Sequence, residues 1–155
     1  MTLNRFTLVF ATLMALALAL PQASFAAPTM LVTPEESSAS DAAGGLLAPR
    51  SAPTLGAPRI EFVAPDLKRP IAVPTKIELR FLSNAPAEPK PETFKALYGA
   101  FKIDITQRLI GLAKVTKDGI SVSDAALPSG KHQLLLSLTD TLGRESQQVV
   151  SFTVQ

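Results

Sequence analysis

The chain has 155 residues, with 15 Lys and Arg against 13 Asp and Glu, one His and neither Cys nor Trp. This balance argues against a nucleic-acid partner, because proteins that bind nucleic acids concentrate basic residues on one face. A chain without Cys has no disulfides, so any folded domain in it depends on its hydrophobic core.

The first 26 residues have the pattern of a secretory signal peptide. Arg5 supplies a positive charge, residues 6–20 are an uncharged run that is apolar apart from two Thr, and Ser24-Phe25-Ala26 places small residues where a signal peptidase reads them. The run of 15 residues is shorter than the about 20 that a membrane-spanning helix needs. We expect cleavage after Ala26, no stable membrane insertion afterwards, and a periplasmic or secreted protein. An uncleaved membrane anchor is the alternative.

Residues 27–58 are rich in Ala, Pro, Ser, Thr and Gly and contain five prolines. Such a composition buries too little apolar surface to offset the entropy of ordering the backbone. We therefore expect a disordered, flexible linker. A short recognition peptide that docks Leu46 and Leu47 on a partner is the functional alternative.

From Arg59 onward, apolar residues recur at every second position, which is typical of half-buried strands. The inward sets that this pattern predicts are Ile60 and Phe62; Ile77, Leu79 and Phe81; Phe94, Ala96 and Tyr98; Phe101, Ile103 and Ile105; and Val150, Phe152 and Val154. Gly99-Ala100 and Lys117-Asp118-Gly119 predict tight turns. A single helical turn capped by Thr106 is expected over residues 107–110.

The clearest strand is the leucine-rich stretch over residues 127–144. It opens with a Pro/Gly turn, runs through Leu134, Leu136 and Leu138, and closes with the Asp-x-x-Gly turn at Asp140. With its neighbours it completes about seven or eight short strands over residues 59–155. Two packed antiparallel sheets in one domain are the expected solution at this size.

The pattern Leu127-Pro128-x-Gly130-x-His132-x-Leu134-x-Leu136-x-Leu138-x-Asp140-x-x-Gly143-Arg144, followed by Phe152-x-Val154, resembles the immunoglobulin-like (fibronectin-type-III-like) β-sandwich domains of exported bacterial proteins. The resemblance covers residues 58–155 and implies an immunoglobulin-like antiparallel β-sandwich. Such modules serve as spacers, adhesion units and accessory binding domains, and the fold does not choose among these roles. The chain lacks the Cys pair and Trp of antibody domains, so we expect phenylalanines to fill that space: Phe62, Phe81, Phe101 and Phe152.

The residue types that carry catalysis are sparse. We interpret His132 as a partly exposed structural residue and not as a catalytic base, and one His cannot supply a common zinc site. The acids Asp104, Asp118, Asp124 and Asp140 are spread over different segments without a calcium-loop spacing. Asp118 and Asp140 are expected to cap turns. No cofactor, no metal and no catalytic residue is predicted.

Binding is the remaining function. The preferred hypothesis is a non-enzymatic module that binds another envelope or surface protein, either by an exposed strand edge or by an apolar patch if the outward residues Leu82, Leu97, Leu135 and Val149 cluster. A carbohydrate- or peptidoglycan-binding accessory domain is the alternative and requires exposed aromatic residues, although Tyr98 is expected to point inward. The third hypothesis, an enzyme that uses carboxylates alone, requires two acids across a cleft.

Overall fold

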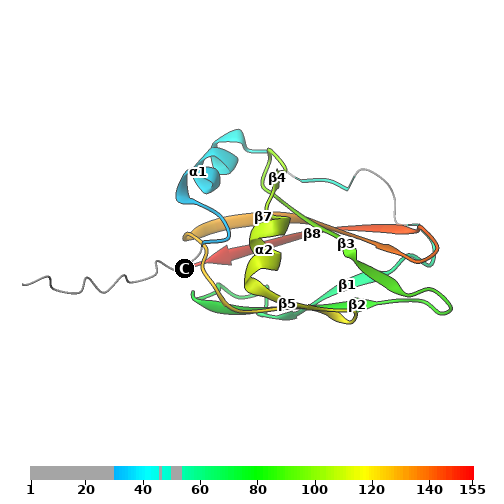
Figure 1. Ribbon diagram of the computed structural model, residues 1–155. Helices are drawn as coiled ribbons and strands as arrows, with labels where there is room; N and C mark the ends of the chain where they lie inside the picture. The colour runs from blue at the N-terminus through cyan, green and yellow to red at the C-terminus, as the bar shows by residue number, and fades with distance from the viewer. Residues whose placement is uncertain (1–29, 46, 50–53) are drawn as a thin grey trace, which may run out of the picture.

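The computed structural model describes residues 30–45, 47–49 and 54–155, and this part of the chain forms two antiparallel sheets that pack face to face (Figure 1). The first sheet has the strand order β1-β2-β6-β5, with β1 at Arg59–Ala64, β2 at Thr75–Leu82, β6 at Gly119–Ala125 and β5 at Ala113–Thr116. The second sheet has the order β4-β3-β7-β8, with β4 at Ile103–Asp104, β3 at Pro89–Tyr98, β7 at Gly130–Asp140 and β8 at Glu145–Val154. The predicted all-β sandwich is confirmed.

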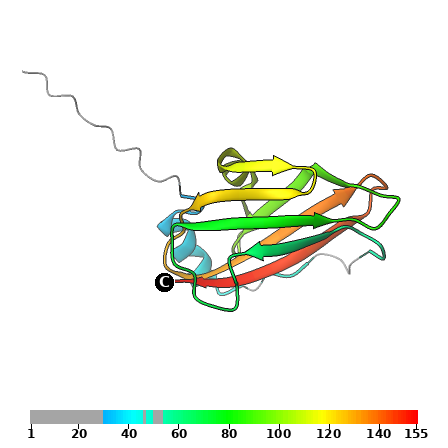
Figure 2. The same cartoon turned by 90° about the horizontal axis from the view of Figure 1, so that it is seen from below.

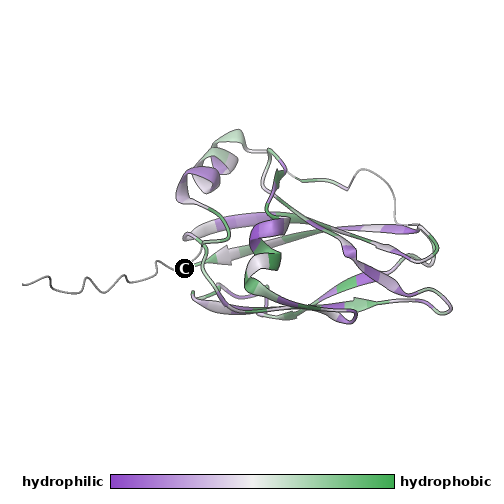
Figure 3. Ribbon diagram, in the orientation of Figure 1, coloured by the Kyte–Doolittle hydropathy of each residue, from purple (hydrophilic) through white to green (hydrophobic). Residues whose placement is uncertain are grey.

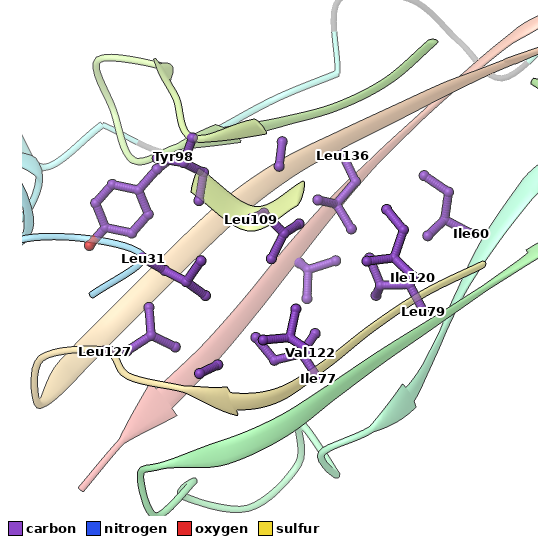
Figure 4. Close-up of a cluster of buried hydrophobic side chains, with 14 of the residues drawn as sticks. Leu31, Ile60, Ile77, Leu79, Tyr98, Leu109, Ile120, Val122, Leu127 and Leu136 are labelled. Atoms are coloured by element: carbon purple, nitrogen blue, oxygen red, sulfur yellow. The ribbon is translucent and has the colours of Figure 1, made fainter. Parts of the chain in front are cut away.

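The core lies between the sheets and is built from the alternating positions of their strands (Figure 4). On β2, Ile77, Leu79 and Phe81 are buried, while Lys76 just before them and Arg80 among them are exposed. On β7, Leu136 and Leu138 are almost fully buried. Alternate side chains of a strand point to opposite faces, so the period of two in the sequence becomes one face turned to the core and one turned away from it.

The predicted inward position of Phe101 is wrong, because the side chain is 63% exposed. Residues 99–102 form a turn in which the N–H of Lys102 donates to the carbonyl of Gly99 over 2.9 Å. The turn interrupts the alternation of inward and outward side chains, so the alternation along β4 does not predict the side on which Phe101 lies.

The predicted helical turn is a longer element, α2, at Thr106–Leu112. Thr106 does not cap it. The N–H of Thr106 donates to the Asp104 carboxylate over 2.9 Å, and the Thr106 hydroxyl accepts from the N–H of Ala96 over 3.0 Å. Thr106 therefore ties α2 to β3, and Leu109 of the helix enters the core.

The expectation of a flexible linker over 27–58 is wrong for the residues that the structure describes there. Leu31 and Val32 are buried in the core, and the N–H of Leu31 donates to the carbonyl of Ala126 over 3.1 Å. The helix α1 follows at Pro34–Ala43. Its start is a capping box, in which Thr33 and Glu36 each bond the backbone N–H of the other.

The helix α1 is polar over most of its length and ends in two alanines (Figure 3), and Ser37 is its one buried residue. Specific bonds hold it beside the second sheet (Figure 1). The guanidinium of Arg108 donates to both carboxylate oxygens of Glu36, at 2.7 and 2.9 Å. The N–H of Ala100 donates to the hydroxyl of Ser40 over 3.1 Å. A composition that predicts disorder is thus ordered by tertiary contacts.

The predicted signal peptide, residues 1–26, lies outside the described residues, as does Leu46. Among the helices that the structure describes, none is both long and apolar enough to cross a membrane.

Candidate functional site

Three of the four residues predicted to form an apolar binding surface lie in one row. Leu97 on β3 is opposite Leu135 on β7, and Leu135 is opposite Val149 on β8. Leu82 lies on β2 in the other sheet, on the face opposite to the buried Phe81. The four residues therefore do not join into one patch.

The row of Leu97, Leu135 and Val149 is not an open surface. Leu135 is 4% exposed although it faces away from the core. The backbone N–H of Leu47 donates to the side-chain carbonyl of Gln133 over 3.1 Å, and Leu47 is itself buried. Gln133 and Leu135 share one face of β7, since they are two residues apart. Leu47 thus lies on the face on which the sequence predicts a partner.

His132 is buried, and the expectation of partial exposure is wrong. It is 1% exposed, its ring stacks on Phe152 with centroids 5.4 Å apart, and its Nδ1 lies 2.8 Å from the hydroxyl of Tyr98. Its Nε2 lies 2.8 Å from the carbonyl of Pro128. Because a carbonyl can only accept, Nε2 carries a proton, and in the neutral ring Nδ1 accepts from Tyr98.

Burial sets the charge of this pair. It lowers the pKa of His132, outweighing the bond to Pro128 and the Asp41 carboxylate, and so favours the neutral ring. Burial also raises the pKa of the Tyr98 hydroxyl, although a hydrogen bond with Ser37 of α1 opposes the shift. Tyr98 points inward as predicted, and with His132 it forms a hydrogen-bonded structural pair beneath α1.

Asp140 caps the turn between β7 and β8, as the sequence predicts. Its Oδ1 accepts from the N–H groups of Leu142 and Arg144, each at 2.9 Å, and its Oδ2 accepts from Nε of Arg144 at 2.7 Å. Burial raises the pKa of this carboxyl, but the three bonds and the charge of Arg144 prevail and lower it. Asp140 is therefore an ionised structural acid.

The other predicted acids do not assemble into a centre. Asp104 bonds Thr106, while Asp118 and Asp124 are exposed on the first sheet and its turn. Within the described part of the chain, no three His, Cys, Asp or Glu residues lie close enough to hold a metal ion. Phe101 is the one exposed aromatic side chain there, so the cluster required for ring stacking on sugars does not form among those residues.

The edges of the two sheets differ in how they are protected. Natural edge strands avoid unwanted pairing by being short, by bulges, and by Lys or Pro residues. The edge strand β1 has a bulge between Phe62 and Ala64 and then Pro65, β4 has two residues, and β5 has four residues including Lys114. These three edges are therefore blocked.

The fourth edge, β8, lacks these devices, and among the described residues only its end is covered, by the parallel bridge of Ile71 to Val154. It has ten residues, contains neither Lys, Arg nor Pro, and pairs with β7 without a register shift from Glu145 to Val154. It runs along the margin of the sandwich (Figure 2). The candidate site is this edge, and its recognition groups are backbone amides and carbonyls.

The comparisons with known proteins return little. No family model matches the chain, and no curated protein matches it. One solved structure that is similar is the crystal structure of CopC from Methylosinus trichosporium OB3b. It has 16% sequence identity and a TM-score of 0.42, and the match covers 63% of this chain and 94% of that chain.

Proposed function

We propose that this chain is an exported, non-enzymatic immunoglobulin-like module that binds another protein of the cell envelope or surface. The strand order supports the immunoglobulin-like type. Constant-type immunoglobulin domains have sheets ABED and CFG. If β1 to β8 are lettered A, B, C, C′, D, E, F and G, the sheets here read ABED and C′CFG.

The observation that carries protein binding is the contrast between β8 and the other three edges. An unprotected edge strand is a template for pairing with another chain, and proteins that recognise extended peptides use such edges. Because three edges are blocked and one is open, a single, specific pairing site is favoured over non-specific association of strand edges.

The pair of Tyr98 and His132 supports the non-enzymatic part of the proposal. A catalytic histidine must accept a proton from a nucleophile and present it to a leaving group. Both ring nitrogens of His132 are engaged by protein groups, and the ring is buried. Its bonding and burial suit a structural role.

Site-specific photo-cross-linking in the source cell tests the proposal. A photoreactive residue at Ser151, on β8, is expected to give a discrete adduct with an envelope protein. The matched control is the same residue at Ser123, which is also exposed but lies on the first sheet. No adduct from either position, or the same adducts from both, would reject protein binding through β8.

The export part has its own test. Cell fractionation is expected to recover a chain shortened by the predicted signal peptide from the periplasm or the medium. Full-length chain confined to the cytoplasm would contradict it.

A further inference from the structure

We infer that the open stretch of β8 binds an extended peptide segment carrying acidic residues at the end that lies beside Ser151 and Thr153. This inference rests on the proposed function and specifies the chemistry of the partner.

The backbone of β8 presents its free groups at Val149 and Ser151. The N–H of Ile71 donates to the carbonyl of Thr153 over 2.8 Å, and the N–H of Gln155 donates to the carbonyl of Ile71 over 3.0 Å. These bonds show that odd-numbered residues of β8 turn their backbone groups away from β7. In an antiparallel pair this direction alternates along the strand, so Val149 and Ser151 also face outward.

These outward groups have no backbone partner among the described residues, because β8 pairs with β7 alone there and Ile71 reaches only the end of the strand. Two N–H donors and two carbonyl acceptors at Val149 and Ser151 fit the spacing of a short strand segment. An extended peptide satisfies them through its own backbone, largely independently of its side chains. The edge of β8 therefore recognises the extended conformation of a peptide and not its sequence.

The charged residues beside the edge of β8 determine which residue types of the peptide are favoured. A surface hollow of about 430 Å³ adjoins Ser151 and Thr153, and its lining includes Lys68, Arg69 and Lys131. The lining contains no carboxylate, although Asp66 lies 3.7 Å from Arg69 as an exposed ion pair. Lys68 and Lys131 are exposed. A peptide leaving the edge at this end meets net positive charge, which favours Asp or Glu there.

A second copy of the chain fits this charge less well. The sequence of β8 contains one acid, Glu145, at its start and none near its end. Pairing of two β8 strands would bring one carboxylate toward each basic hollow, whereas a partner with acidic flanks brings several. The partner strand therefore belongs to a different, acidic chain.

The test uses the processed protein and the capped peptide Glu-Glu-Thr-Val-Thr-Val-Thr-Glu-Glu. Acids at both ends make the probe independent of strand direction. Its control has lysine in place of every glutamate. We expect the acidic peptide to bind at least about tenfold more tightly than the basic one at low salt, with the difference shrinking at high salt. Hydrogen exchange of the amides of Val149 and Ser151 should slow on binding.

Two pairs of variants locate the binding. Val149→Pro removes an outward N–H that the fold does not use, which an edge strand tolerates, and it should abolish binding, whereas Val149→Thr should keep it. Lys68→Glu combined with Lys131→Glu should remove the preference for the acidic peptide. Lys114→Glu combined with Lys117→Glu, at exposed positions on β5 and in the turn before β6, is the matched charge control. If Val149→Pro does not fold, the lysine variants and the exchange of Val149 and Ser151 decide the question.

Several outcomes overturn the inference: no binding of the acidic peptide, equal binding of both peptides, or binding that survives in folded Val149→Pro. A dimer formed through β8 that excludes the peptide also overturns it. If the cross-link from Ser151 persists while the peptides fail, protein binding stands and the acidic-strand inference alone is rejected.

Discussion

The hydroxyl of Tyr98 lies 2.8 Å from Nδ1 of His132, and this bond makes the one histidine of the chain an acceptor on that side. Tyr98→Phe removes the donor and leaves a buried nitrogen without a partner. We expect the free energy of unfolding to fall by about 1–3 kcal/mol, measured by urea denaturation. A value unchanged from the wild type would contradict the buried hydrogen bond.

The stability of the protein should fall as the pH drops below the pKa of an ordinary histidine. Burial holds the pKa of His132 in the folded chain below 6.5, its ordinary value in the unfolded chain. At a pH between these two pKa values, the unfolded chain binds a proton that the folded chain does not. Stability rises with pH wherever the unfolded state binds more protons. The contribution of neutral His132 to the free energy of unfolding is therefore complete above about pH 6.5. It is lost as the pH falls toward the pKa of His132 in the folded chain.

Urea denaturation from about pH 7.5 to about pH 5.5 isolates this effect, because the lowered pKa values of Asp140 and Glu36 act at more acidic pH. His132→Gln should remove the slope in that range, whatever its effect on absolute stability. A slope that persists in the variant would assign the effect to another group.

Leu47 and Leu55 form a matched pair for testing the N-terminal segment. Leu47 is 7% exposed and Leu55 is 96% exposed. We expect Leu47→Ala to lower the free energy of unfolding by about 1–3 kcal/mol, toward the low end of buried leucine truncations because the site lies outside the main core. Leu55→Ala should be neutral. Equal effects would mean that Leu47 is not held on the second sheet in solution.

Removal of residues 27–45 should destabilise the sandwich and not merely shorten a tail. The shortened chain lacks Leu31 and Val32, whose burial contributes roughly 1.5–3 kcal/mol each. Differential scanning calorimetry should show a lower melting temperature than for residues 27–155. The same melting temperature for both chains would support the linker that the composition predicts.

The strands could be predicted from the sequence because their apolar residues alternate and their turns carry Gly and Pro. The alternation of Ile77, Leu79 and Phe81 on β2 determines which face is buried. It does not say which sheet the strand joins. For that reason Leu82 could be assigned outward, but its separation from Leu97 could not be foreseen.

The missed helix α1 did leave a signal. Thr33-Pro34-Glu35-Glu36 has the spacing of a capping box with Pro at the first helical position. The Ala- and Ser-rich composition outweighed it, since α1 has no apolar stripe and depends on Arg108, which is 72 residues away in the chain. The basic hollow left no signal in the sequence, because Lys68 and Lys131 are brought together only by the fold.

For the export that we propose, the backbone bond between Leu31 and Ala126 would constrain the order of events. Cleavage after Ala26, as the sequence predicts, leaves residues 27–29 between the new N-terminus and Met30, the first described residue, which pairs with Ala126. Three extended residues reach at most about 11 Å. A peptidase bound at the membrane could scarcely approach its target against a finished sandwich, so leader removal is expected to precede the docking of the N-terminal segment.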